Sequence, residues 1–237
     1  MKWGQITETG LVRPNNEDNL LICPDIGLFV VADGMGGHRA GEVASKQALT
    51  YLEKQLRLAL SYSNDLAEKL KETITKVNQY IYEMSCQDNS LQGMGTTITA
   101  CLIKDDLAMV AHVGDSRAYL IRDNTIKQVT DDHSLVGELV KNGSISEELA
   151  QVHPRRNVLT QAIGVSPNVD ADIYQVPLQA RDQLMLCTDG LTNHLTRSDI
   201  LKTVATTQDP QRAVKQLADA ALSQGGTDNI TIILIEI

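Results

Sequence analysis

The chain has 237 residues, of which 42% are hydrophobic and 22% charged, and its formal net charge is −9. This composition is that of a globular domain with a full core, and it excludes a disordered or fibrous chain. The negative charge and an aromatic content of 3% also exclude a general nucleic-acid binder, which needs a basic face for phosphates and aromatic rings for bases.

The cysteines are scattered, with no C-x-x-C pair, and the first residues lack the apolar stretch of a signal peptide. No uninterrupted apolar run approaches the roughly 20 residues that a membrane span needs. We therefore expect a cytoplasmic protein with reduced thiols and no membrane segment.

Residues 3–12 predict a first strand and its turn, and a second strand is expected at 20–22. Between them, the sequence R-P-N-N-E-D-N at 13–19 has the proline and asparagines of a turn. The run L-F-V-V-A at 28–32 has the composition of a buried strand. It ends at Asp33, and the glycines that follow permit a tight backbone turn, so we expect this carboxylate at the tip of a rigid strand.

Apolar residues at helical spacing predict two long helices, at 41–60 and 65–84, that pack on a core. Strands are expected at 93–103, 107–113 and 118–122, and their short connections favour antiparallel hairpins. The chain lacks a regular alternation of strands and helices. This absence disfavours a doubly wound parallel sheet and favours antiparallel sheets with helices outside.

The stretch 131–158 is more polar than its surroundings, and it predicts two short helices that we interpret as a small mobile flap. A strand follows at 178–188, a helix with a capping box at 196–204, a third long helix at 209–224 and a final strand at 230–237. No repeat or linker interrupts the chain, so we expect a single domain over residues 1–237.

Aspartates recur at the edges of the apolar stretches, and one isolated Asp-Gly pair would indicate only a turn. The recurring positions are Asp33, Asp115, Asp189 and Asp228. With Glu17 they form an oxygen-only ligand set that suits Mg²⁺ or Mn²⁺, whereas no His/Cys cluster has the spacing of a zinc site. Two such ions can share a carboxylate and generate a hydroxide that attacks phosphorus in line. Arg13 is a candidate phosphate binder, and Arg39 and Arg117 also lie close in sequence to candidate ligands.

Other chemistries fit less well. A cysteine-nucleophile phosphatase would need an arginine six positions after Cys187, and that position is Asn193. The chain has no G-x-S-x-G elbow and no G-x-x-x-x-G-K-[ST] loop, which disfavours a serine hydrolase and an NTPase. We expect His112 and His194 to satisfy local hydrogen bonds, and His38, next to the glycine turn, is the better candidate for proton transfer.

Eight motifs that follow one another along nearly the whole chain resemble the metal-dependent Ser/Thr protein phosphatases of type 2C, in particular their compact bacterial members. The motifs are R-P-N-N-E-D at 13–18, V-A-D-G-M-G-G-H at 31–38, G-M-G-T-T at 93–97, H-V-G-D-S-R at 112–117, T-D-D-H-S at 130–134, L-T-Q-A-I-G at 159–164, C-T-D-G-L at 187–191 and G-G-T-D-N-I-T at 225–231. Each is weak alone, but all eight in this order are specific.

The resemblance implies an α+β fold, a four-layer α-β-β-α sandwich of two antiparallel β-sheets flanked by helices, with a flap at about 134–158. It also implies metal ions in a cleft at one end of the sandwich. Asp33 would bridge the two principal ions, Asp189 and Asp228 would bind the first, and Glu17 with the Gly34 carbonyl would bind the second. A third, weaker ion would be held by Asp115 together with Asp189, and Arg13 would bind the substrate phosphate.

Many eukaryotic members carry a histidine as general acid directly after the D-G pair, where this chain has Met35. Either His38 or a metal-bound water would then protonate the leaving group. The resemblance implies metal-dependent hydrolysis of phosphoserine and phosphothreonine in phosphoproteins, opposing a bacterial eukaryotic-like Ser/Thr kinase, by a cytoplasmic monomer. The alternative is a pseudophosphatase that serves as a scaffold. Such a protein should have lost metal ligands, whereas every expected ligand is present here.

Overall fold

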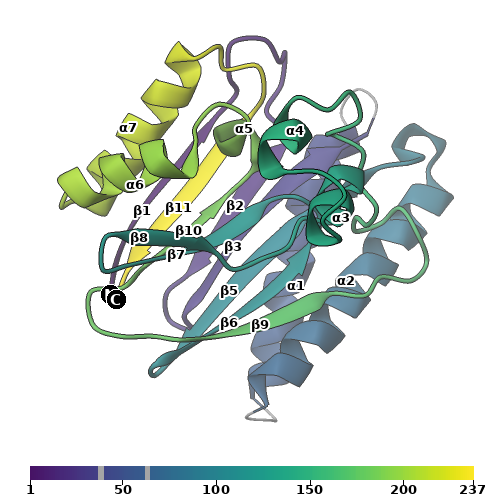
Figure 1. Ribbon diagram of the computed structural model, residues 1–237. Coiled ribbons are helices and arrows are strands. Elements are labelled where there is room, and N and C mark those ends of the chain that lie inside the picture. The colour runs from purple at the N-terminus through teal and green to yellow at the C-terminus, as the bar shows by residue number, and fades with distance from the viewer. Residues whose placement is uncertain (37–39, 62–64) are drawn as a thin grey trace.

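The computed structural model describes residues 1–36, 40–61 and 65–237. Its strands form two antiparallel sheets that pack face to face, with helices on both outer faces (Figure 1). The first sheet has the order β1 (Lys2–Glu8), β11 (Ile230–Glu236), β10 (Gln183–Cys187), β7 (Arg117–Arg122) and β8 (Thr125–Gln128). The second has the order β2 (Asp18–Cys23), β3 (Leu28–Met35), β5 (Ile98–Lys104), β6 (Leu107–Val113) and β9 (Asp172–Pro177), and β4 (Gly95–Thr96) pairs with β3.

Strand β3 lies inside the molecule and is buried on both faces. Leu28, Val30 and Ala32 belong to the core beneath the helices of the second sheet. Phe29 and Val31, which point the opposite way because side chains alternate along a strand, belong to the core between the sheets. The continuous apolar run at 28–32 therefore reflects a central strand with no solvent-facing side.

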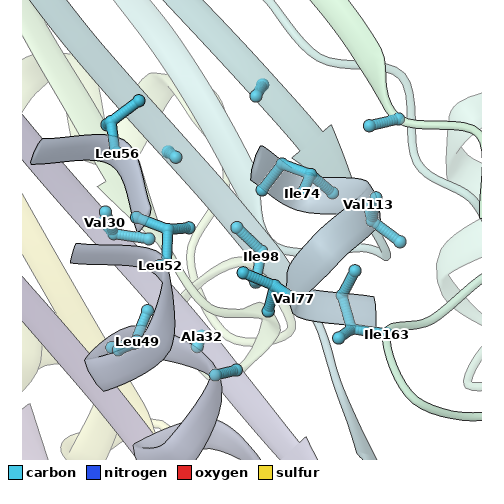
Figure 2. Close-up of a cluster of buried hydrophobic side chains, with 14 of the residues drawn as sticks. Val30, Ala32, Leu49, Leu52, Leu56, Ile74, Val77, Ile98, Val113 and Ile163 are labelled. Carbon is cyan, nitrogen blue, oxygen red and sulfur yellow. The ribbon is translucent and has the colours of Figure 1, made fainter. Parts of the chain in front are cut away.

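Two helices, α1 (Ala40–Leu60) and α2 (Leu66–Gln87), cover the second sheet. Figure 2 shows how their apolar side chains meet those of the strands: Leu49, Leu52 and Leu56 of α1 and Ile74 and Val77 of α2 surround Val30, Ala32, Ile98 and Val113. Because each helix turns one apolar stripe to the sheet, the predicted stripes are confirmed as packing surfaces.

The outer face of the first sheet is covered by α6 (Arg197–Thr206) and α7 (Pro210–Ser223). The capping box predicted at the start of α6 is present, since Thr196 and Asp199 each bond the other's backbone N–H. Pro210 occupies the first turn of α7, where its missing N–H costs nothing. With these layers in place, the expected four-layer α+β architecture is confirmed.

The stretch 134–158 contains two short helices, α3 (Leu135–Lys141) and α4 (Glu147–Gln151). Their N-caps are Ser134 and Ser146. The stretch leaves and rejoins the sandwich at one place, because the N–H of Leu135 donates to the carbonyl of Val158 at 2.8 Å. We refer to residues 134–158 as the flap.

Some local features differ from the expectations. Strand β9 and the short helix α5 (Asp189–Thr192) were not predicted. Residues 178–182 form a loop before β10 rather than its first half. Strand β3 also continues past Asp33 to Met35, because Gly34 and Met35 pair with β4.

Within the described ranges, none of the helices combines the length and the apolar character that crossing a membrane requires.

Candidate metal centre

The candidate ligands come from separate strands that end on the same side of the sandwich. Asp33 lies near the end of β3 and is the register partner of Asp18 on β2. Asp115 lies in the turn between β6 and β7, Asp189 opens α5 directly after β10, and Asp228 precedes β11. Strand β10 pairs antiparallel with both β7 and β11, so these last three positions lie at the same end of the strands of the first sheet.

Burial and neighbouring negative charges raise the pKa of several of these aspartates. Loss of contact with water raises the pKa of Asp33 well above its ordinary value, and the charges of Asp18, Asp189, Asp115 and Asp228 raise it further. Burial likewise raises the pKa of Asp115, with Asp189 adding to the effect. Because like charges held together in a poorly solvated place are unfavourable, the site favours a bound cation.

Two buried carboxylate oxygens have no hydrogen-bond partner among the described residues: Oδ1 of Asp18 and Oδ1 of Asp189. The other oxygen of each group is satisfied, since Thr188 donates to Asp18 Oδ2 at 2.8 Å and Asn193 donates to Asp189 Oδ2 at 3.0 Å. A buried acceptor without a donor is costly. A hard divalent cation would satisfy it, so the donor set fits Mg²⁺ or Mn²⁺.

In the structure, the candidate carboxylates do not surround one common point. In the described part of the chain, no three His, Cys, Asp or Glu side chains stand close enough together to hold an ion. Asp228 Oδ2 accepts a hydrogen bond from Arg13 Nη2 at 2.7 Å. The guanidinium therefore competes with a cation for the negative charge of this carboxylate.

Glu17 and Gly34 are placed together by close backbone packing. The N–H of Gly34 donates to the carbonyl of Glu17 at 3.1 Å, and a Cβ on Gly34 would overlap the carbonyl oxygen of Gly41 in α1. Burial raises the pKa of the Glu17 carboxyl. The two expected ligands of the second ion are thus neighbours, and glycines leave the room for this contact.

Asn229 organises the site, although sequence reasoning gave it no role. Its side-chain oxygen accepts from the N–H of Glu17 at 2.8 Å, and its amide donates to the carbonyls of Thr9 and Asn15 at 2.8 and 3.0 Å. It thereby ties the 13–17 segment to the Asp228 segment. The signal available in the sequence was its place in the T-D-N motif at 227–229.

Asp18 was also missed as part of the site. Its side chain is buried between β2 and β10, and burial raises its pKa to about 7 even though hydroxyl donors lower it. Its place in the R-P-N-N-E-D motif was the only sequence signal. Burial of a carboxyl next to other carboxyls became visible only after folding.

The histidines and Cys187 behave largely as expected. His112 is fully buried and bonded to Thr99, and burial lowers its pKa to about 4, which keeps the ring neutral. His194 Nε2 accepts from the N–H of Thr227 at 3.0 Å. Burial raises the pKa of the Cys187 thiol to about 12, so it is no nucleophile at neutral pH. His38 and Arg39 lie outside the described residues.

A groove of about 1130 Å³ leads from the candidate centre to the flap. Its lining includes Asp115 and Asp189 of the candidate centre, Val136 and Val140 of the flap, and Arg197 at the start of α6. The groove is large enough for a stretch of polypeptide and mixes apolar with charged side chains.

Comparison with known proteins places this two-sheet sandwich among the metal-dependent protein phosphatases. A family model described as "Protein phosphatase 2C" matches residues 14–224, and the chain belongs to this family. A curated relative, "Serine/threonine phosphatase stp" of Listeria welshimeri, is 41% identical over 242 residues, which span 97% of this chain and 93% of the relative.

Solved structures agree with this placement. The PPM Ser-Thr phosphatase MsPP of Mycobacterium smegmatis superimposes with a TM-score of 0.90 at 34% identity, covering 100% of this chain and 98% of that one. The catalytic domain of the serine/threonine protein phosphatase PstP, solved in complex with 2 manganese ions, has a TM-score of 0.88 at 33% identity, covering 98% and 96%. Both solved structures therefore share the fold of this chain over nearly its whole length.

Proposed function

We propose that this chain hydrolyses phosphoserine and phosphothreonine esters in proteins, with Mn²⁺ or Mg²⁺ as cofactor. The observation that carries the proposal is the cluster of aspartates at one end of the sandwich, two of which have a buried oxygen without a donor among the described residues. Membership of the phosphatase family and the names of the relatives support the same reaction class.

Each expected ligand keeps its proposed role. Asp33 would be shared by two principal ions, with Asp189 and Asp228 on the first ion and Glu17 with the Gly34 carbonyl on the second. Asp115 would join Asp189 in holding a third, weaker ion. The chemistry that such ions would supply is a lowered pKa of a nearby water molecule and a countercharge for the phosphoryl oxygens.

The chain's own groups would bind and orient the substrate. Arg13, half-exposed beside Asp228, can turn its remaining donors toward a phosphate. The groove between the flap and α6 can accept the polypeptide on either side of the phosphorylated residue. We propose direct attack by water without a phosphoenzyme; Cys187 is no candidate nucleophile, because burial raises the pKa of its thiol to about 12. His38 remains our candidate for protonating the leaving alkoxide, with a solvent molecule as the alternative donor.

We further propose that residues 1–237 act as one catalytic domain with the flap at 134–158, as a cytoplasmic monomer. Its substrates would be the proteins phosphorylated by a eukaryotic-like Ser/Thr kinase, and the kinase itself. The relatives reported above are named as phosphatases, so the pseudophosphatase alternative has no support from them.

The test is release of phosphate from a phosphoserine peptide by the purified protein, followed against Mn²⁺ and Mg²⁺ concentration, with EDTA and the Asp33→Asn variant as controls. We expect metal-dependent release that EDTA and the substitution abolish. Equal release by wild type and variant would contradict the proposed site. Tight Mn²⁺ binding without release under any condition would support the scaffold alternative instead.

A further inference from the structure

Thr97 connects the segment that carries Asp33 with the segment that carries Asp115. It is buried and lies in the short gap between β4 and β5. Its neighbours on the two sides are the backbone of Asp33 and the side chain of Ser116, which directly follows Asp115. No role has been assigned to it above.

On the first side, Thr97 holds the backbone of Asp33 by two hydrogen bonds. The N–H of Thr97 donates to the carbonyl of Asp33 at 2.8 Å, and the N–H of Asp33 donates to Oγ1 of Thr97 at 2.9 Å. In a regular antiparallel pair the second bond would go to the Thr97 carbonyl. The hydroxyl has replaced it, which explains why β4 and β5 are separate strands at this point.

On the second side, Thr97 supports the turn that presents Asp115. Its Oγ1 lies 2.7 Å from Oγ of Ser116, and both groups are buried. Its methyl group packs against Gly114, where a Cβ would come within 2.5 Å of Thr97 Cγ2. Gly114 also has a φ of +113°, which only glycine adopts readily. The turn therefore rests on both branches of the threonine side chain.

A hydroxyl suits this position because it can accept and donate at the same time. Oγ1 accepts from the Asp33 N–H and still shares a hydrogen bond with Ser116. Valine has the same shape but neither function, whereas serine keeps the hydroxyl and lacks only the methyl group. The two substitutions therefore separate hydrogen bonding from packing.

We propose that Thr97 is a positioning residue that sets the spacing between Asp33 and Asp115 and thereby the rate of the chemical step. This proposal rests on the proposed function, because it takes both aspartates as parts of the phosphatase site. Thr97 touches no reacting group itself. It acts on the placement of charge that stabilises the transition state, so its loss should lower kcat and leave KM, which reflects phosphate binding by Arg13, little changed.

The experiment compares Thr97→Val, Thr97→Ser and the control Thr130→Val in the full chain. Thr130 is also buried, and its hydroxyl likewise accepts from a backbone N–H, that of Ala118 at 3.1 Å, but it bonds no candidate ligand. Three quantities are measured: kcat and KM with a phosphopeptide, Mn²⁺ binding by calorimetry without substrate, and the midpoint of thermal unfolding.

We expect Thr97→Val to lower kcat by about 10- to 100-fold and to weaken Mn²⁺ binding, as is typical when a partner of a metal ligand is lost. Thr97→Ser should recover most of kcat. Thr130→Val should lose stability while keeping kcat and Mn²⁺ affinity; because Thr130 lines the groove, its KM does not serve as a control. Wild-type kcat and Mn²⁺ affinity in folded Thr97→Val would overturn the inference.

If Thr97→Val does not fold, Ser116→Ala decides, because it removes only the partner hydroxyl. Reduced kcat at unchanged KM would support the proposal, and wild-type kcat would overturn it. Failure of the proposed function itself is recognised separately, since the wild-type protein would then show no metal-dependent turnover at all.

Discussion

Arg13 donates a hydrogen bond from Nη2 to Oδ2 of Asp228 across 2.7 Å, although the two residues are 215 positions apart in the chain. The side chain of Arg13 is 49% exposed and that of Asp228 23% exposed, so the pair lies at the mouth of the candidate centre. The nearby charges of Asp33 and Asp189 also favour the charged guanidinium and keep its pKa raised. Arg13 thus lies where it can bind either an incoming phosphate or the carboxylate of Asp228.

Replacement of Arg13 by alanine should raise KM for phosphopeptides by about 10-fold or more and lower kcat less, because a charge-assisted hydrogen bond to the phosphate contributes about 1.5–3 kcal/mol. Mn²⁺ affinity should not fall, since the competing partner of Asp228 is gone. Steady-state kinetics and calorimetry measure both. Arg57→Ala, which removes an exposed arginine paired with Asp25 and Glu53, is the control. An unchanged KM would remove Arg13 from the site.

Replacement of Asp33 or Asp189 by asparagine should reduce turnover by at least about 100-fold without unfolding the protein. Burial raises the pKa of both groups, and the charge of Asp228 raises each of them further, so a neutral side chain relieves repulsion at both positions. We expect the thermal midpoint without metal to stay or rise, and the rise caused by Mn²⁺ to shrink. Asp25→Asn, at an exposed ion pair, should keep both activity and the Mn²⁺ effect. Near-normal turnover by either purified variant would contradict the assignment of Asp33 and Asp189 as metal ligands.

Replacement of Gly190 by alanine should impair the centre by pushing two ligand segments apart. An added Cβ would overlap the carbonyl oxygen of Asn229, next to Asp228, while Gly190 itself follows Asp189. We expect weaker Mn²⁺ binding and lower kcat in calorimetry and kinetics, together with some loss of stability. Gly93→Ala is the control, because its φ of +76° makes alanine strained but nothing lies within 4 Å. If Gly190→Ala retained wild-type Mn²⁺ affinity, the close packing of α5 on β11 would be irrelevant to the site.

The ion pair of Arg122 and Asp182 should make stability depend on pH in the acidic range. Arg122 Nε and Nη2 donate to the two carboxylate oxygens at 2.8 and 2.5 Å, and this pairing lowers the pKa of Asp182. Because the pKa of Asp182 is lower in the folded protein, its charge stabilises the fold fully at pH values above the unfolded-state pKa of about 3.9. This stabilisation disappears as the pH falls through the folded-state pKa.

We therefore expect Asp182→Asn to lower the thermal midpoint by a few degrees at pH 7, and the difference from wild type to vanish once the pH falls below the lowered pKa of Asp182. Thermal unfolding followed from pH 7 to pH 2 measures this. A difference that stays constant over the whole range would mean that the hydrogen bond from the Gln179 N–H to Asp182, rather than its charge, carries the effect.

The periodicity of apolar residues in the sequence predicted most of the helices and strands, but it missed strand β9 and the last residues of β3. The run at 28–32 and the helical stripes were readable because burial repeats with the period of the element. Strand β9 was missed because it is an edge strand with only one fully buried residue, Val176, and so has no clear alternation. The extension of β3 to Met35 depends on pairing with β4, a partner that the sequence of β3 does not contain.

By itself, the sequence determined most of the element types, the order of the eight motifs and the acidic residues at strand ends, since these follow from residue chemistry and short-range spacing. Only the tertiary structure decided that Asp18 and Asp189 keep a buried oxygen without a donor among the described residues, that Arg13 reaches Asp228, and that Thr97 joins Asp33 to the Asp115 turn. The reason is that desolvation, charge repulsion and hydrogen bonding depend on distances between residues far apart in the chain, and folding alone fixes those distances.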